Sequence, residues 1–285
     1  MPYVITLIAP SQAPILEAAA HVQKNLNCRE RKPTGTALDL ESDTPAAKQL
    51  MDDVRAKFAV DILCQDAAHR HKRLFIADMD ATMVEEETLD ELAGYVGLKD
   101  QIAAITRRAM EGELDFHAAL RERVGLLKGL SATALEQTAA KMTFTKGGKQ
   151  LLSALKRNNV TCILVSGGFT FFTSRVAAFL GFDENHGNIL NIEDGLLTGT
   201  VGEPILDKTF KQNCLEQSAA RLGIPLSATV AIGDGANDLP MLQTAGLGVG
   251  FQSKPLLRDA LSNHLLFNGL DALIPVLGLT PPQVE

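Results

Sequence analysis

The sequence predicts an α/β protein built on a doubly wound parallel sheet, with an inserted helical cap and a small N-terminal α/β domain. Three short apolar segments, at 74–77, 161–165 and 229–232, each run into a polar turn, as buried strands of a parallel sheet do. About eighty residues with helical periodicity separate the first segment from the second. Because this stretch is too long for a simple crossover connection, it predicts a separate helical cap.

The N-terminal domain is expected over residues 1–66. Thr44 followed by Pro45 has the pattern of an N-cap with proline at the first helical position. Strands are expected at 4–8, 36–40 and 59–63, with a weakly marked one near 28–33, and helices at 12–26 and 44–58. This order of elements resembles the small ACT-like regulatory domains. Two roles stay open: sensing an amino acid, or only helping the chain to dimerise or to stay folded.

The second domain is expected over residues 73–285, because the polar stretch 65–72 lacks apolar periodicity. The cap should cover about 85–145, with a capping box at Thr88–Glu91 opening its first helix. Further helices are expected at 148–158, 169–180, 210–222 and 239–244, a structural hairpin at 189–201, a last strand at 247–249 and a frayed end at 280–285.

Acidic residues follow two of the three apolar strands. Asp78 and Asp80 are two apart in an extended segment, so both carboxylates can face one small volume. Two such like charges repel, and are tolerated mainly where a metal cation neutralises one or where one is held protonated. Asp234 and Asn237 follow the third strand and Ser166 follows the second, so all five should converge at one edge of the sheet.

These motifs, DxDxT at 78–82, SGG at 166–168 and GDGAND at 233–238, resemble in order and spacing the haloacid dehalogenase superfamily of phosphohydrolases. Within it, segments 85–93 and 116–130 are similar to the phosphoserine phosphatase family, and the resemblance covers about 73–275. It implies Mg²⁺-dependent hydrolysis of O-phosphoserine to serine through an aspartyl phosphate. The main alternative is action on another small phosphate ester, such as phosphohomoserine.

The resemblance also implies roles for single residues. Asp78 is the expected nucleophile and Asp80 the general acid and base. The Mg²⁺ ligands would be the carboxylates of Asp78 and Asp234 and the backbone carbonyl of Asp80, and Asp238 would orient these ligands without binding the metal itself. Substrate-binding residues for the phosphate end would be Ser166 and Gly167, through a hydroxyl and a backbone N–H at a helix N-terminus, together with Lys211 and Asn237. In the cap they would be Glu87, Phe116 and Arg123. Lys208 competes with Lys211 for the cationic role, but Lys211 has the family's distance before Asp234. Ala81 departs from the serine usual in similar proteins.

Other readings of the same residues are weaker. A dinucleotide-binding oxidoreductase needs a glycine-rich turn after the first strand, and 78–82 contains no glycine. An EF-hand-like loop from Asp234 would need glutamate where Ala245 stands. A noncatalytic serine sensor would fit the N-terminal domain, but the paired aspartates argue against it.

Composition limits the classes of partner. The 285 residues carry a net charge of −7 and a pI near 5.4, which argues against nucleic-acid binding. The four cysteines form no CxxC pair, the N-terminus lacks a positively charged leader, and no apolar run reaches membrane-spanning length. We therefore expect a cytoplasmic protein with a small-molecule substrate and no membrane or nucleic-acid partner, and a homodimer through the N-terminal domain is left open.

Overall fold

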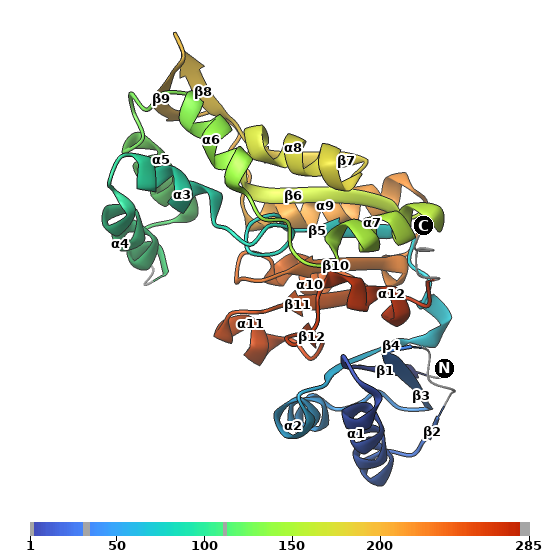
Figure 1. Cartoon of the computed structure of the whole chain (residues 1–285). Helices are drawn as coiled ribbons and strands as arrows, with labels where there is room; N and C mark the ends of the chain where they lie inside the picture. Colours follow the sequence, from blue (N-terminus) through green and yellow to red (C-terminus); the bar gives the residue numbers. More distant parts are fainter. Residues whose placement is uncertain (1–2, 31–34, 111–112, 280–285) are drawn as a thin grey trace.

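A computed structural model describes residues 3–30, 35–110 and 113–279 (Figure 1). Part of the weak strand expected near 28–33 and the ending 280–285 lie outside the described residues. The N-terminal unit is a four-stranded antiparallel sheet of order β2-β3-β1-β4. Its elements are β1 (Tyr3–Ile8), α1 (Gln12–Asn25), β2 (Cys28–Glu30), β3 (Ala37–Ser42), α2 (Lys48–Phe58) and β4 (Asp61–Asp66).

The two helices of this unit cover one face of its sheet, where residues such as Ile5, Leu40 and Met51 form a separate apolar core. The predicted helix start at Thr44 is wrong, because α2 begins at Lys48. The backbone N–H of Thr44 donates to the hydroxyl of Ser42 at 3.2 Å. This bond stabilises a turn at the end of β3, and Thr44 does not cap a helix.

The second unit is built on a six-stranded parallel sheet of order β12-β11-β10-β5-β6-β7, which confirms the predicted fold class. Its strands are β5 (Leu74–Ala77), β6 (Thr161–Phe169), β7 (Glu184–Asn188), β10 (Thr229–Gly233), β11 (Leu247–Phe251) and β12 (His264–Leu265). Its helices are α7 (Gly148–Arg157), α8 (Thr170–Leu180), α9 (Lys208–Arg221), α10 (Leu239–Thr244), α11 (Pro255–Ala260) and α12 (Leu273–Val276).

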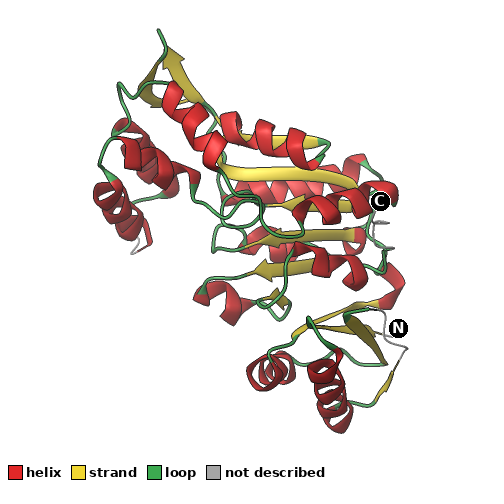
Figure 2. Cartoon of the chain, in the orientation of Figure 1, coloured by secondary structure: helices red, strands yellow, loops and turns green. Residues whose placement is uncertain are grey.

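Helices cover both faces of this sheet (Figure 2). Along β5, Leu74 and Ile76 face one apolar cluster, which includes Leu215 of α9, and Phe75 faces the other, which includes Leu151 of α7. This alternation is what a strand buried on both faces requires, and it explains the continuous apolar run that predicted the strand.

The cap consists of α3 (Thr88–Tyr95), α4 (Lys99–Met110), α5 (Phe116–Gly125) and α6 (Thr133–Lys141), and it lies beyond the carboxyl ends of the strands (Figure 1). An antiparallel bridge between Val84 and Phe144 joins the outgoing and returning chain. The hairpin β8 (Leu190–Glu193) and β9 (Leu196–Val201) packs on the cap, where Leu197 accepts a hydrogen bond from the Gly129 N–H at 2.8 Å. The hairpin therefore extends the cap.

Polar contacts join the two units beside β12. The buried carboxylate of Asp61 accepts backbone N–H groups of Leu266 at 2.7 Å and of Asn268 at 3.0 Å. The guanidinium of Arg55 donates to the Ser262 carbonyl. Because a buried carboxylate is costly without partners, these bonds fix the N-terminal unit against the edge of the parallel sheet.

Candidate active site

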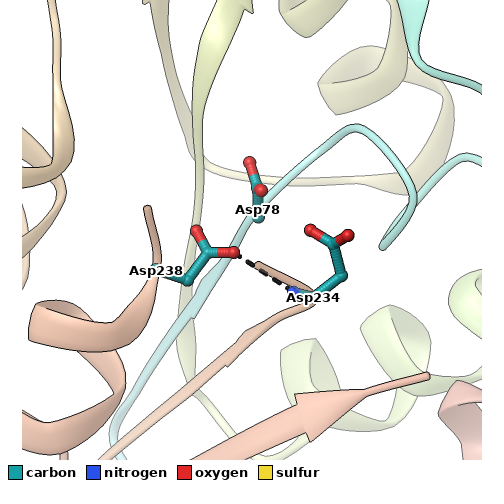
Figure 3. Close-up of side chains that lie close together, drawn as sticks. All are labelled: Asp78, Asp234 and Asp238. Carbon is teal, nitrogen blue, oxygen red and sulfur yellow. Dashed lines mark hydrogen bonds between the residues drawn. The ribbon is translucent and has the colours of Figure 1, made fainter. Parts of the chain in front are cut away.

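Three buried aspartates meet where β5 and β10 end (Figure 3). Asp78 follows β5, Asp234 follows β10, and Asp238 stands at the start of α10. One carboxylate oxygen of each lies within 4.8 Å of the others. Carboxylate oxygens are hard donors and fit a divalent cation such as Mg²⁺ better than zinc, for which histidine and cysteine are the more usual ligands.

Hydrogen bonds already hold both oxygens of Asp238. Its Oδ2 accepts the backbone N–H groups of Asp234 and Gly235, each at 3.1 Å, and its Oδ1 accepts from Lys211 Nζ at 2.6 Å. A Cβ on Gly233 would lie 2.4 Å from the Asp238 Cγ, so the first glycine of the GDG turn makes room for this carboxylate. Asp238 therefore stabilises the turn through its hydrogen bonds, whereas the carboxylate of Asp234 faces the possible metal site.

Lys211 reaches the site from α9 and is 2% exposed. Its Nζ lies 2.7 Å from Asp78 Oδ1 and 2.6 Å from Asp238 Oδ1. Burial alone would lower the pKa of Lys211, but the two carboxylates outweigh it and raise this pKa. Lys208, the competing lysine, is exposed at the first position of α9.

Burial and the neighbouring Asp238 raise the pKa of Asp78, against the opposing effect of Lys211. A cation bound between Asp78 and Asp234 would lower both pKa values and keep both groups ionised. Asp80 is half-buried and takes hydrogen bonds from Thr88, at 3.4 Å from the N–H and 3.3 Å from the hydroxyl. Burial first and then the charge of Glu87 raise the pKa of Asp80 to about 7.

The predicted capping box at Thr88–Glu91 is wrong. Glu87 is the N-cap residue of α3, and Thr88 is the first residue inside the helix. The Thr88 hydroxyl donates to the Asp80 carboxylate instead of capping the helix, so this threonine connects the cap to the loop that follows β5. Ala81, in the same loop, adopts a left-handed φ of 51°, which is strained for a residue with a Cβ.

The Ser-Gly-Gly segment belongs to β6, which continues to Phe169, and α8 begins only at Thr170. The expectation that Ser166 and Gly167 stand at a helix N-terminus is therefore wrong. The Ser166 hydroxyl accepts the Gly168 N–H at 2.8 Å. A Cβ on Gly168 would lie 2.9 Å from Asp80 Oδ2, so the glycine lets the backbone approach the Asp80 carboxylate closely.

Two predicted substrate residues of the cap face this region. The ring of Phe116 lies against Gly167, since a Cβ there would be 3.4 Å from its Cζ. Arg123 is half-buried and donates to the Ala119 carbonyl at 3.3 Å. Burial lowers the pKa of Arg123, and the carboxylates of Asp90 and Glu87 oppose this.

Glu87 and Asn237 are exposed, and Asn237 lies in the turn between Asp234 and Asp238. Lys254 was missed by the sequence reasoning, although it follows β11 at the same edge of the sheet. Its Nζ lies 2.8 Å from Asp234 Oδ2 and 3.1 Å from Glu87 Oε1. The one available signal was its place after a fourth parallel strand.

A comparison with family models matches residues 75–243 to the haloacid dehalogenase-like hydrolases. The chain therefore belongs to this family. A curated phosphoserine phosphatase of Streptomyces coelicolor is 40% identical over 258 residues, which cover 90% of this chain. The match spans only 60% of that relative's length.

Solved structures agree with this family. A haloacid dehalogenase family hydrolase of Salmonella enterica serovar Typhi superposes with a TM-score of 0.87 at 31% identity, covering 97% of this chain and 98% of the other. A substrate-bound phosphoserine phosphatase superposes with a TM-score of 0.67 at 37% identity, covering 72% of this chain and 97% of the other. In the part of the chain that the structure describes, no helix is long and apolar enough to cross a membrane.

Proposed function

We propose that the chain is a phosphoserine phosphatase, which hydrolyses O-phospho-L-serine to L-serine and phosphate in the last step of serine biosynthesis. The observation that carries this proposal is the pair Asp78 and Asp80 at the end of β5, with Lys211 bound to the first carboxylate. The similarity to phosphoserine phosphatases supports the choice of substrate.

In this proposal the Asp78 carboxylate attacks phosphorus and forms an aspartyl phosphate. Asp78 and Asp234, with the backbone carbonyl of Asp80, would hold a Mg²⁺ ion, which supplies positive charge against the repulsion between nucleophile and phosphate. Lys211, fixed by Asp238, adds a second positive charge beside Asp78. Asp238 acts as a support because its own oxygens are already bonded.

Asp80 carries the proton in both halves of the reaction. A pKa of about 7 lets it protonate the serine oxygen as that oxygen leaves and then accept a proton from the attacking water. The Ser166 hydroxyl and the Gly167 N–H bind the phosphate oxygens, while Asn237 contacts the substrate from the turn after β10.

The cap would bind the amino-acid end of the substrate. Glu87 would pair with the ammonium and Arg123 with the carboxylate, because hydrogen bonds between oppositely charged groups are strong and directional. Phe116, packed against Gly167, would shield the bound ester from water.

A panel of phosphorylated metabolites tests this function, with phosphate release measured with and without Mg²⁺. We expect phosphoserine to have the highest kcat/KM. A clear preference for phosphohomoserine, or for an ester without an amino group, would contradict the proposed substrate but leave the phosphatase chemistry standing.

We also propose a cytoplasmic enzyme that can form a homodimer through its N-terminal unit. All four cysteines are free, which suits a reducing compartment. Strand β2 is at the edge of its sheet and offers a pairing surface. Light scattering on the full chain and on a variant with proline in β2 tests the dimer.

A further inference from the structure

Lys254 connects the two groups of carboxylates in the site. Its ammonium bridges Asp234 Oδ2 in the catalytic unit, at 2.8 Å, and Glu87 Oε1 at the start of the cap, at 3.1 Å. The side chains of Lys254 and Glu87 are each 50% exposed, whereas that of Asp234 is 7% exposed. The lysine therefore stands at the mouth of the site, between the deep aspartates and the cap.

The position of Lys254 is fixed by its backbone and its neighbours. Its N–H donates to the Asp234 carbonyl at 2.9 Å. The preceding Ser253 is 1% exposed, and its hydroxyl bonds Nδ1 of the buried His264 at 2.8 Å. Arg258 Nε donates to the Ser253 carbonyl at 2.7 Å. These bonds fix the backbone from which the Lys254 side chain extends, so its ammonium is presented from a defined place at the mouth of the site.

We propose that Lys254 is an internal counter-ion that competes with the divalent cation for Asp234 and with the substrate's ammonium for Glu87. Each carboxylate has a second oxygen, Asp234 Oδ1 and Glu87 Oε2, without a hydrogen-bond partner among the described residues. A cation on that oxygen would lie a few ångströms from the ammonium of Lys254 and would be repelled by it. Lys254 thus limits the affinity for both ligands. The substrate part rests on the proposed function.

The cation part is tested by titrating Mg²⁺ into metal-free protein in a calorimeter. Lys254→Met removes the charge and keeps most of the apolar stem, so we expect Mg²⁺ to bind roughly tenfold more tightly than to the wild type. Lys254→Arg keeps the charge and should bind Mg²⁺ about as the wild type does. Lys208→Met is the matched control, because Lys208 is an exposed lysine on α9, the helix that carries Lys211, and its loss should leave Mg²⁺ binding unchanged.

Thermal unfolding gives a second readout that needs no substrate. Without Lys254 the carboxylates of Asp234 and Glu87 lose their counter-ion, so the Tm of metal-free Lys254→Met should fall while the Mg²⁺-saturated Tm falls less. Unchanged or weaker Mg²⁺ binding by this variant would overturn the proposal, because it would mean that Lys254 orients Asp234 instead of competing for it. If the methionine variant does not fold, Lys254→Gln decides by the same two measurements.

The substrate part uses steady-state kinetics at saturating Mg²⁺. Lys254→Met should lower KM for phosphoserine several-fold and leave KM for p-nitrophenyl phosphate, which has no ammonium, unchanged. In a Glu87→Gln background the same substitution should no longer affect KM for phosphoserine; an effect of equal size there would refute competition at Glu87. A protein that releases no phosphate from phosphoserine would refute the proposed function alone, because the Mg²⁺ titration judges Lys254 independently.

Discussion

The site has a deep part, formed by Asp78, Asp238 and Lys211, and a rim, formed by Glu87, Arg123 and Lys254. Both contain carboxylates and cationic side chains, but in different surroundings. In the deep part, Lys211 is 2% exposed and holds Asp78 and Asp238 at 2.7 and 2.6 Å. On the rim, the side chains of Lys254 and Glu87 are half exposed, and Lys254 Nζ lies 3.1 Å from Glu87 Oε1. Because solvent screens an exposed ion pair, the rim pair contributes little to stability, whereas the loss of one partner in the buried set leaves a costly unpaired charge.

This difference suits two tasks of the proposed phosphatase. Chemistry on phosphorus would need charges that are already oriented when the substrate arrives, as in a buried and hydrogen-bonded set. Recognition of the substrate would need groups that can exchange partners as it enters and leaves, as the half-exposed Glu87 and Lys254 can. Variants of the deep part should therefore change kcat most, and variants of the rim should change selectivity.

The largest effect is expected for Asp78→Asn, which should abolish phosphate release. The amide can neither attack phosphorus nor balance the charge of a cation. The protein should stay folded, because Lys211 keeps its ion pair with Asp238. Phosphate release and circular dichroism check this, with deamidation excluded by mass spectrometry. Substantial turnover by the intact variant would remove the nucleophile role from Asp78.

Asp80→Asn should slow turnover of phosphoserine by roughly 10² to 10⁴, the usual range of general acid–base catalysis. The loss should be smaller for p-nitrophenyl phosphate, whose leaving group needs no proton. Single-turnover measurements with both substrates make the comparison. If the two substrates lose the same factor, Asp80 does not act as the acid.

Sequence alone predicted three aspartates of the site because each of them has a local signal, whereas Lys211 and Asp238 were implied by the family resemblance. Continuous apolar strands and the turns after them identified Asp78, Asp80 and Asp234, and the parallel sheet brings these residues to one edge. The choice of Lys211 over Lys208 depended on distance along the chain, and Lys211 is the one that reaches the aspartates.

The contacts that sequence missed depend on how separate segments meet. Lys254 bonds Glu87, which is 167 residues away, so no local pattern could reveal the pair. The sequence predicted a helix cap at Thr88, but the hydroxyl of Thr88 donates instead to the carboxylate of Asp80 in the loop after β5. Strand β7, with the polar sequence ENHGN, gave no strand signal because it pairs at the edge of the sheet.

On the rim, Arg123→Ala should lower kcat/KM for phosphoserine. The drop should correspond to a loss of roughly 2–3 kcal/mol in transition-state stabilisation, the scale of a lost hydrogen bond between charged groups. Esters without a carboxylate should change little, because they never make the contact. Glu87→Gln should likewise affect esters that carry an ammonium and spare phosphoglycolate.

Salt sharpens this comparison between rim and deep part. Added KCl should weaken discrimination by the rim more than it slows the chemical step, because exposed charges are screened and buried ones are not. An equal loss by Arg123→Ala for phosphoserine and p-nitrophenyl phosphate would assign Arg123 to the structure of the cap or to the chemistry, and not to specificity.

The smallest expected effect concerns the segment that anchors the rim lysine. His264 is 1% exposed; its Nδ1 lies 2.8 Å from the Ser253 hydroxyl and its Nε2 3.0 Å from the Leu261 carbonyl. Since a carbonyl only accepts, Nε2 carries a proton, and in the neutral ring Nδ1 then accepts from the Ser253 hydroxyl. Burial first, and then the nearby Arg55 and Lys48, lower the pKa of His264 to about 4, while its bond to Leu261 and the charge of Asp52 oppose this.

The pKa of His264 is lower in the folded protein, about 4, than in the unfolded chain, about 6.5. The contribution of this histidine to stability is therefore complete at pH values above 6.5 and is lost as the pH falls toward 4, because the unfolded chain then binds a proton that the folded protein does not. Between pH 7 and pH 5 the loss should be about 2 kcal/mol in the free energy of unfolding. Urea unfolding at both pH values measures it, and His264→Gln, which cannot be protonated, should lose less than the wild type. Equal losses in the two proteins would mean that other groups cause the acid sensitivity and that His264 is not the titrating anchor of Ser253 and Lys254.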